Sequence, residues 1–273
     1  MKKIVFACDG NNFPKGAFEF VKDLQKTESL LLTGCFLQSV NFEEMIPGLF
    51  ATYAGPTAAF MELEKAEYKK TMLLFEELCQ HNGIEYRVHE ESNNWNMDDL
   101  LKETRFADLM IMSEELFCTN INMTEPNSFM QRAIHKSECP VMLFPETYKP
   151  FKKLVFAYDG KKESMFALKQ FCNLFPRYSH LETNIVYSKP GHVDELPDMM
   201  YIEEYASRHF SNLQFEKLLF NGRKYFADWA KEENDILLIS GSYGRSGLST
   251  AINKSFVEKL IEEHQVPVFI AHT

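Results

Sequence analysis

Residues 241–255, GSYGRSGLSTAINKS, contain the residue types that hold a phosphate group. Glycines let backbone N–H groups approach an anion, and a helix start directs further N–H groups at it. The stretch follows the apolar run 235–240 and precedes the amphipathic run 255–264. It therefore joins an expected strand to an expected helix, and phosphate binding is the first chemistry to consider here.

Two enzyme motifs resemble this loop without matching it. Residues 240–244, SGSYG, differ from the nucleophile elbow G-x-S-x-G in their first residue, and no aspartate follows Ser242 to complete a triad. Residues 247–255 differ from the P-loop by one extra residue and by Asn253 in place of its second glycine. Neither a serine esterase nor a P-loop kinase or ATPase is favoured.

The composition excludes several other classes of protein. A net charge of −10 over 273 residues disfavours binding to nucleic acid. The six cysteines have no Cys-x-x-Cys or zinc-type spacing, so they are expected to be buried and reduced. No apolar run approaches the 18 residues or so of a membrane span. We expect a cytoplasmic protein without a membrane or nucleic-acid partner.

The chain contains an internal repeat. Residues 2–10 (KKIVFACDG) return as residues 152–160 (KKLVFAYDG), 150 positions later. Two further stretches return 127 positions later, namely 107–113 as 234–240 and 138–144 as 265–271. The sequence therefore predicts two copies of one domain, residues 1–147 and residues 151–273. The extra residues of the first copy lie around 41–60, as a lid or a packing arm.

Apolar runs and helical periodicity alternate within each copy. Strands are expected at 3–8, 29–37, 84–89, 108–113, 140–145, 153–158, 181–187, 214–220, 235–240 and 266–271. Helices are expected near 14–26, 59–82, 97–106, 128–137, 163–175, 200–211, 221–232 and 255–264. This alternation predicts an α/β protein with two tandem open parallel five-stranded sheets, each covered by helices on both faces in flavodoxin-like layers. In such sheets, ligands bind beyond the carboxyl ends of the strands.

The repeat and the loop together resemble the universal stress protein family. Its nucleotide loop reads G-x-x-G, nine residues, then G-[S/T]. Here residues 241–244 supply the first part, residues 245–248 the familiar Arg-x-Gly-Leu interior, and Lys254-Ser255 the end. The resemblance covers essentially the whole chain, as two domains of the adenine-nucleotide-hydrolase-like kind.

The resemblance implies a stress-response protein that binds an adenine nucleotide (ATP or AMP), with Mg²⁺ as a companion of the phosphates, in its second half. It implies site residues near Asp159, the main chain around Val186, and the loop. The candidate site residues are Ala157, Asp159, Val186, Ser240, Gly241, Gly244, Lys254, Ser255 and Phe256. No general base, metal cluster or nucleophile is evident, so any ATP hydrolysis is expected to be slow. The alternative is an interaction module of the same fold for protein partners or an unknown small ligand.

Lys254 departs from the family pattern, and two outcomes are open. A lysine is strained where the backbone needs a positive φ, and it blocks close approach to a phosphate. Its ammonium would otherwise attract a triphosphate. Ser255 also has a plain structural role, because residues 255–258 form a capping box. Asp159 before Gly160 is likewise a common turn residue.

The first half lacks the glycines of the nucleotide loop. An offset of 127 puts Glu114 at the place of Gly241 and Phe117 at that of Gly244. Asn127 and Ser128 then correspond to Lys254 and Ser255. Both glycines are absent and a carboxylate would repel phosphate, so no triphosphate site is expected there. The two halves are expected to pair as an intramolecular pseudo-dimer, and a further homodimer is left open.

Overall fold

The computed structural model describes residues 1–9, 13–37, 58–88, 97–113, 128–188, 196–218, 235–241 and 266–272. The expected helices at 221–232 and 255–264, and residues 41–57 of the insertion, lie outside these ranges. None of the described helices is long and apolar enough to cross a membrane.

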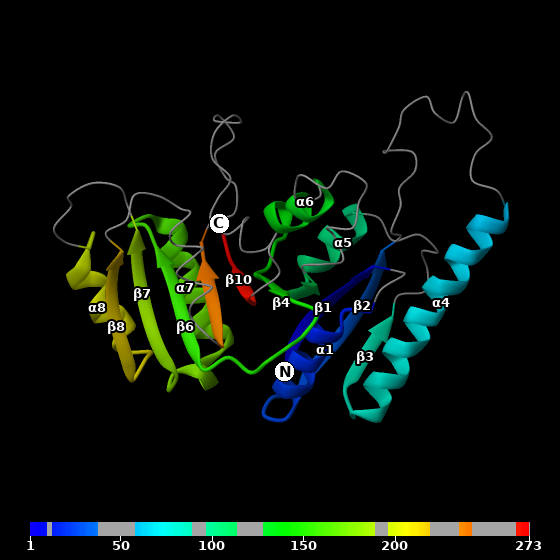
Figure 1. Cartoon of the computed structure of the whole chain (residues 1–273), viewed down its shortest axis with the longest axis horizontal. Coiled ribbons are helices and arrows are strands. Elements are labelled where there is room, and N and C mark those ends of the chain that lie inside the picture. The colour runs from blue at the N-terminus through cyan, green and yellow to red at the C-terminus, as the bar shows by residue number, and fades with distance from the viewer. Residues whose placement is uncertain are drawn as a thin grey trace, which may run out of the picture.

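The described strands form one ten-stranded sheet that runs through the whole molecule (Figure 1). Its order is β3-β2-β1-β4-β5-β10-β9-β6-β7-β8. The strands are β1 (Lys2–Asp9), β2 (Leu30–Leu37), β3 (Glu85–Val88), β4 (Leu109–Ser113), β5 (Val141–Phe144), β6 (Lys153–Tyr158), β7 (Glu182–Ser188), β8 (Asn212–Leu218), β9 (Ile236–Ser240) and β10 (Val268–Ile270). Each half has the same order, since β8-β7-β6-β9-β10 repeats β3-β2-β1-β4-β5. All ten expected strands are confirmed within a few residues.

The helices also follow the expected pattern. They are α1 (Lys15–Gln25), α4 (Ala58–His81), α5 (Met97–Thr104), α6 (Ser128–Lys136), α7 (Lys162–Leu174) and α8 (Met199–Ala206), with a 3₁₀ turn η1 (Pro176–Tyr178). Helix α8 ends earlier than the expected 211, because Ser207 closes its last turn and β8 begins at Asn212. The α/β class with a mostly parallel open sheet is thus confirmed.

At the junction between the halves, the two expected five-stranded sheets are joined into one. Strand β5 pairs with β10 in antiparallel fashion, and Met142 lies opposite Phe269. The other strand pairs are parallel. Pairing the fifth strands edge to edge satisfies the backbone groups that each sheet would otherwise expose at that edge. Two five-stranded units therefore become one sheet.

The fourth strands of the two halves are offset by one residue from the sequence repeat. Met110 pairs with Val141 in β5, whereas Leu238 pairs with Val268 in β10. Val268 is 127 residues after Val141, but Leu238 is 128 residues after Met110.

Asp235, just before β9, has a left-handed backbone with a φ of 54°. Ser240 consequently takes the sheet position of Met112, and Gly241 that of Ser113 rather than that of Glu114.

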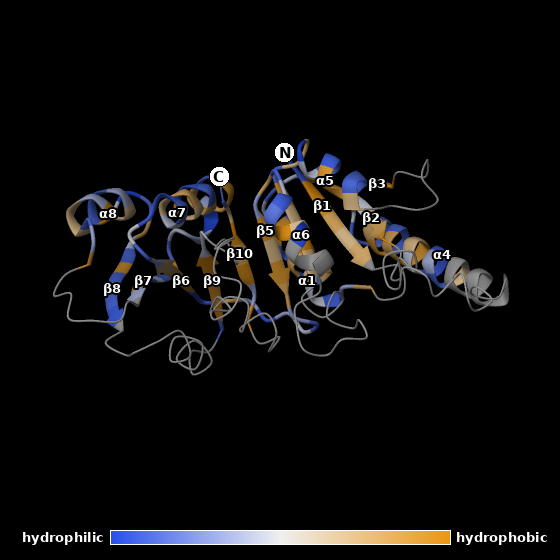
Figure 2. Ribbon diagram, turned by 90° about the horizontal axis from the view of Figure 1, so that it is seen from above, coloured by the Kyte–Doolittle hydropathy of each residue, from blue (hydrophilic) through white to orange (hydrophobic). Residues whose placement is uncertain are grey.

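Two apolar clusters cover the two faces of the sheet (Figure 2). The larger cluster packs against α1, α4, α7 and α8 and is rich in aromatic rings. The smaller cluster packs against α5 and α6 in the first half. Strand side chains alternate between these faces, as Leu154 and Phe156 on one and Val155 on the other show. The continuous apolar runs of the sequence are explained by burial on both faces.

A polar and aromatic contact joins the halves beside the sheet. The Arg177 guanidinium donates a hydrogen bond to Thr27 Oγ1 (2.6 Å) and another to Asp23 O (3.2 Å). Phe20 lies between rings from both halves, with centroids 4.6 Å from Phe144 and 6.2 Å from Phe175. Helix α1 is therefore packed against residues of the second half.

The described cysteines are free and buried, so their thiols should be slow to react. They are Cys8, Cys35, Cys79, Cys139 and Cys172. Burial raises the pKa of Cys79, Cys139 and Cys172 to about 12, which leaves very little thiolate at neutral pH. We expect these thiols to resist Ellman's reagent at pH 8 in the native protein and to react once it is denatured. Rapid native labelling of Cys139 or Cys172, located by peptide mapping, would contradict this burial.

Candidate functional site

Three of the candidate site residues lie in one row across the second half of the sheet. Ala157 in β6 pairs with Val186 in β7 on one side and with Ser240 in β9 on the other. The row continues to Ile270 in β10. Because these strands are parallel, their carboxyl ends meet at one edge, and the row lies close to that edge. The structure thus brings together residues that are far apart in the sequence.

In the first half, buried side chains fill the corresponding row of the sheet. Ala7 in β1 pairs with Cys35 in β2. On its other side, Phe6 pairs with Ile111 in β4, so the next residue of β4, Met112, lies beside Ala7. Ala7, Cys35 and Met112 are all fully buried. In the second half, Ser240 replaces the methionine and Ala157 is partly exposed. A serine is much smaller than a methionine, so the space over Ala157 remains accessible where that over Ala7 is closed.

Asp159 follows this row, and its carboxylate is engaged in a local turn. Its Oδ1 accepts a hydrogen bond from the Lys161 backbone N–H (3.0 Å), and its Oδ2 lies 3.3 Å from Lys161 Nζ. Gly160 has a φ of 77°, which suits glycine. This Asx turn leads into α7 and explains the Asp-Gly pair without a ligand. The Asp159 side chain is nevertheless 44% exposed, so it remains accessible from solvent.

Gly241 is required by packing. A Cβ atom at Gly241 would lie closer than 3.0 Å to the backbone of Glu163 and Ser164, in the first turn of α7. Real Cβ atoms essentially never make such contacts. Helix α7 therefore approaches the end of β9 more closely than any other residue type at position 241 would allow. The start of α7 and the start of the loop are thereby held together at the carboxyl edge.

The remaining candidate residues lie outside the described part of the chain. These are Gly244, Lys254, Ser255 and Phe256. In the first half, Glu114, Phe117 and Asn127 also lie outside it, while Ser128 begins α6 as expected. Expectations that depend on these positions remain predictions from the sequence.

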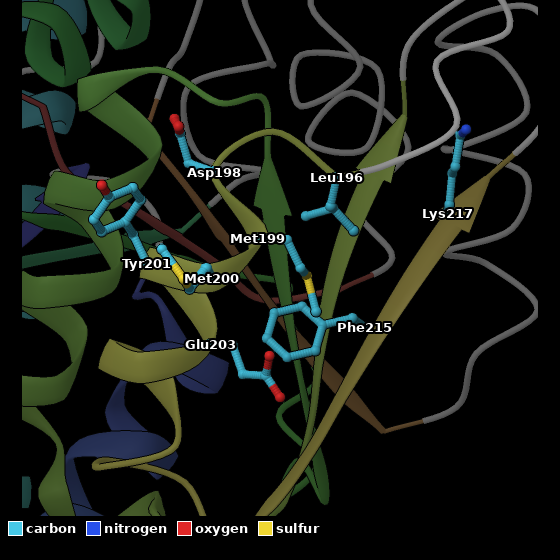
Figure 3. A pocket seen from close by; sticks show the side chains of 8 residues that line it. All are labelled: Leu196, Asp198, Met199, Met200, Tyr201, Glu203, Phe215 and Lys217. Carbon is cyan, nitrogen blue, oxygen red and sulfur yellow. The ribbon is translucent and has the colours of Figure 1, made fainter.

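A hollow of about 670 Å³ lies elsewhere, between α8 and the edge strand β8 (Figure 3). Leu196, Met199 and Phe215 gather at its centre, while Asp198 and Lys217 lie at its rim. Phe215 packs against the larger apolar cluster, whereas Ala157 packs against the smaller one. The hollow is therefore on the opposite face of the sheet from the candidate site, and none of the candidate site residues that the structure describes lines it.

Two polar residues that the sequence patterns did not single out lie on the face of the candidate site. Glu216 in β8 pairs with Val186, and Asn184 pairs with Val155 and Gln214 one step further from the carboxyl edge. Asn184 is 4% exposed. The signal that could have revealed it is an amide inside the strand expected at 181–187, which becomes part of β7 (ETNIVYS).

Comparison with known proteins identifies the fold. No protein-family model and no curated protein sequence matches the chain. Among solved structures, a universal stress protein from Archaeoglobus fulgidus DSM 4304 is 17% identical, with a TM-score of 0.72 over 99% of this chain and 96% of that one. A functionally unknown protein from Pseudomonas aeruginosa PAO1 is 13% identical, with a TM-score of 0.58 over 100% and 92% of the two chains. The chain therefore has the fold of the universal stress proteins over its whole length, which confirms the resemblance seen in the sequence.

Proposed function

We propose that this protein is a universal-stress-type stress-response protein that binds an adenine nucleotide, ATP or AMP, in its second half. The site comprises the row Val186–Ala157–Ser240, Asp159 beside it, and the loop that begins at Gly241. The base lies over Ala157, and the phosphates lie at the loop. Two observations support the proposal: the full-length similarity in fold, and a carboxyl edge where strand ends and a glycine loop converge.

The observation that carries the proposal is the difference in accessibility between Ala157 and Ala7. The halves share strand order, yet Ala7 is fully buried and Ala157 is partly exposed. A site that is kept only in the second half accounts for this difference. It also agrees with the loss of both loop glycines from the first half.

The proposed protein consists of two domains in one chain. Residues 1–147 and 151–273 are two universal-stress-type domains that form an intramolecular pseudo-dimer through β5 and β10. The protein works in the cytoplasm without membrane or nucleic-acid partners. Any Mg²⁺ arrives with the triphosphate, because the described residues contain no group of three His, Cys, Asp or Glu side chains that could hold a metal ion. Hydrolysis, if measured, is slow.

A second candidate function is a module of the same fold that binds protein partners or another small ligand. It is favoured by the local roles of Asp159, which shapes a turn, and of Gly241, which packs against α7. The mass spectrum of small molecules released from the purified protein separates the two functions. An adenine nucleotide favours the first, and titration of Lys254→Gly then shows whether the lysine weakens or strengthens binding.

Replacing Ser240 with methionine should reproduce the filled row of the first half and weaken ATP binding. Met112 occupies the same sheet position without exposure, so the fold can accommodate this side chain. We expect Ser240→Met to weaken ATP binding at least about tenfold, because each 1.4 kcal/mol of lost contact is a factor of ten. Isothermal titration calorimetry would measure it.

Two controls accompany this variant. Leu154→Met places a methionine on the opposite face of β6, where Leu154 is buried in the larger cluster, and should retain ATP binding. Thermal unfolding of Ser240→Met without nucleotide shows that its fold is intact. If a folded Ser240→Met protein binds ATP as tightly as the parent, the nucleotide does not lie over Ala157.

A further inference from the structure

The face of the sheet that carries the candidate site ends in two hydrogen-bond acceptors that have no partner in the described part of the chain. Asn184 is 4% exposed, and its Oδ1 has no hydrogen-bond partner within the described residues. Glu216 is a partly buried residue, and no hydrogen bond or ion pair joins its carboxylate to a described residue. A buried acceptor without a partner costs about 1–3 kcal/mol, so such atoms usually face water, an ion or a ligand.

The strand register places both acceptors beside the accessible alanine. Glu216 is in the row of Val186 and Ala157, two strands from the alanine. With strands about 4.8 Å apart, its Cα lies about 10 Å from that of Ala157, roughly the length of a purine plus a hydrogen bond. Asn184 is two residues before Val186 in β7, on the same face. The two acceptors therefore flank the outer end of a ring placed over Ala157.

The composition of β8 supports a polar boundary to this face. Figure 2 shows the central strands as hydrophobic and β8 as largely hydrophilic. The neighbours of Glu216 along the strand, Phe215 and Lys217, point to the other face, where they line the hollow of Figure 3. Glu216 is thus directed towards the candidate site, away from that hollow.

We propose that Glu216 and the Asn184 Oδ1 atom together recognise the 6-amino group of a bound adenine, in place of which guanine carries a carbonyl oxygen. An amino group carries two N–H bonds, which can serve one acceptor each. This inference rests on the proposed function and deepens it, because it assigns the selectivity for a 6-aminopurine to two named side chains. A base without an amino group leaves both acceptors unpaired, which is the condition under which a polar site discriminates strongly.

The first half offers a natural comparison. Thr33 pairs with Val5 as Asn184 pairs with Val155, and its Oγ1 is also buried without a partner among the described residues. Cys35 stands where the second half has Val186. The filled row of Ala7 and Met112 closes this half to a ligand, so Thr33 should have no influence on nucleotide selectivity.

The test is a set of calorimetric titrations of the full chain with ATP, GTP and purine riboside 5′-triphosphate, which lacks the amino group. We expect wild-type protein to bind ATP at least about tenfold more tightly than the other two. Asn184→Leu and Glu216→Leu should each reduce the ratio between ATP and purine riboside triphosphate. The double variant should bring that ratio close to one. The controls Thr33→Val and Lys217→Gln should leave it unchanged.

Each other outcome has a separate meaning. If the protein binds all three nucleotides equally, or binds GTP as tightly as ATP, this inference is wrong and nucleotide binding stands. If it binds none of them, the proposed function fails and the inference fails with it. An unchanged ratio in folded Asn184→Leu and Glu216→Leu proteins would also overturn it, by showing that these side chains do not meet the base.

Discussion

Replacing Phe20 with alanine is expected to lower the free energy of unfolding by about 3–5 kcal/mol, which is the usual cost of removing a fully buried phenylalanine. Phe20 is 0% exposed. Its ring contacts Phe144 in β5 and Phe175 after α7, so the cavity would lie where the two halves meet. Denaturant unfolding followed by far-UV circular dichroism measures the loss.

The position of Phe20 also predicts how the variant unfolds. Phe75 is equally buried, but its ring partners among the described residues, Phe6, Phe36 and Tyr86, all belong to the first half. We expect both Phe20→Ala and Phe75→Ala to be destabilised, and only Phe20→Ala to separate the unfolding of the two halves into two transitions. A single sharp transition in Phe20→Ala, with the same loss as in Phe75→Ala, would contradict a coupling role for this ring.

Replacing Gly241 with alanine is expected to destabilise the protein without nucleotide by about 1–3 kcal/mol, the usual range for overpacking. The added Cβ would meet the backbone of Glu163 and Ser164, which cannot rotate away as the end of a long side chain can. The start of α7 would have to move, and Asp159 and the loop would move with it. We therefore expect weaker ATP binding as well as a lower midpoint of thermal unfolding.

Gly83 provides the control for this substitution. It has a φ of 64°, and a Cβ there would meet nothing within 4 Å. Gly83→Ala should cost only the strain of a left-handed backbone, about 1 kcal/mol, and leave ATP binding unchanged. If Gly241→Ala proves as stable as the parent protein, the close approach of α7 to β9 is wrong, and the glycine serves the loop alone.

The sequence predicted the elements well because each one carries its own periodicity. The run KKLVFAYDG is apolar on both faces, and it forms a central strand that is buried on both faces. The helix expected at 59–82 appears as α4, whose packed side contains Phe75 and Cys79. The ends of these elements agree within a few residues, since Pro and Gly residues such as Pro14 before α1 and Gly83 after α4 lie beside them.

The partners of those elements were harder to predict. The pairing of β5 with β10 depends on two edges that meet only after each half has folded, and no local pattern encodes it. The one-residue offset of β9 was missed because the motifs around Asp108 and Asp235 look alike in sequence. Only Asp235 adopts the left-handed conformation. This offset moved the counterpart of Gly241 from Glu114 to Ser113.

The candidate site was predicted in part. The sequence and the family resemblance pointed to Ala157, Val186 and Ser240, and the structure places these three in one row. The glycine at 241 was ascribed to phosphate approach, and the structure gives it a packing role as well. Accessibility could not be read from the sequence, because it depends on which side chain stands beside Ala157 in the neighbouring strand.

The most direct test of the central claim is the stoichiometry of ATP binding to the purified wild-type chain, measured by isothermal titration calorimetry after any bound nucleotide has been removed. One site in the second half and none in the first predicts one ATP per chain. Zero would contradict the proposal of a nucleotide-binding protein, and two would contradict the loss of the site from the first half.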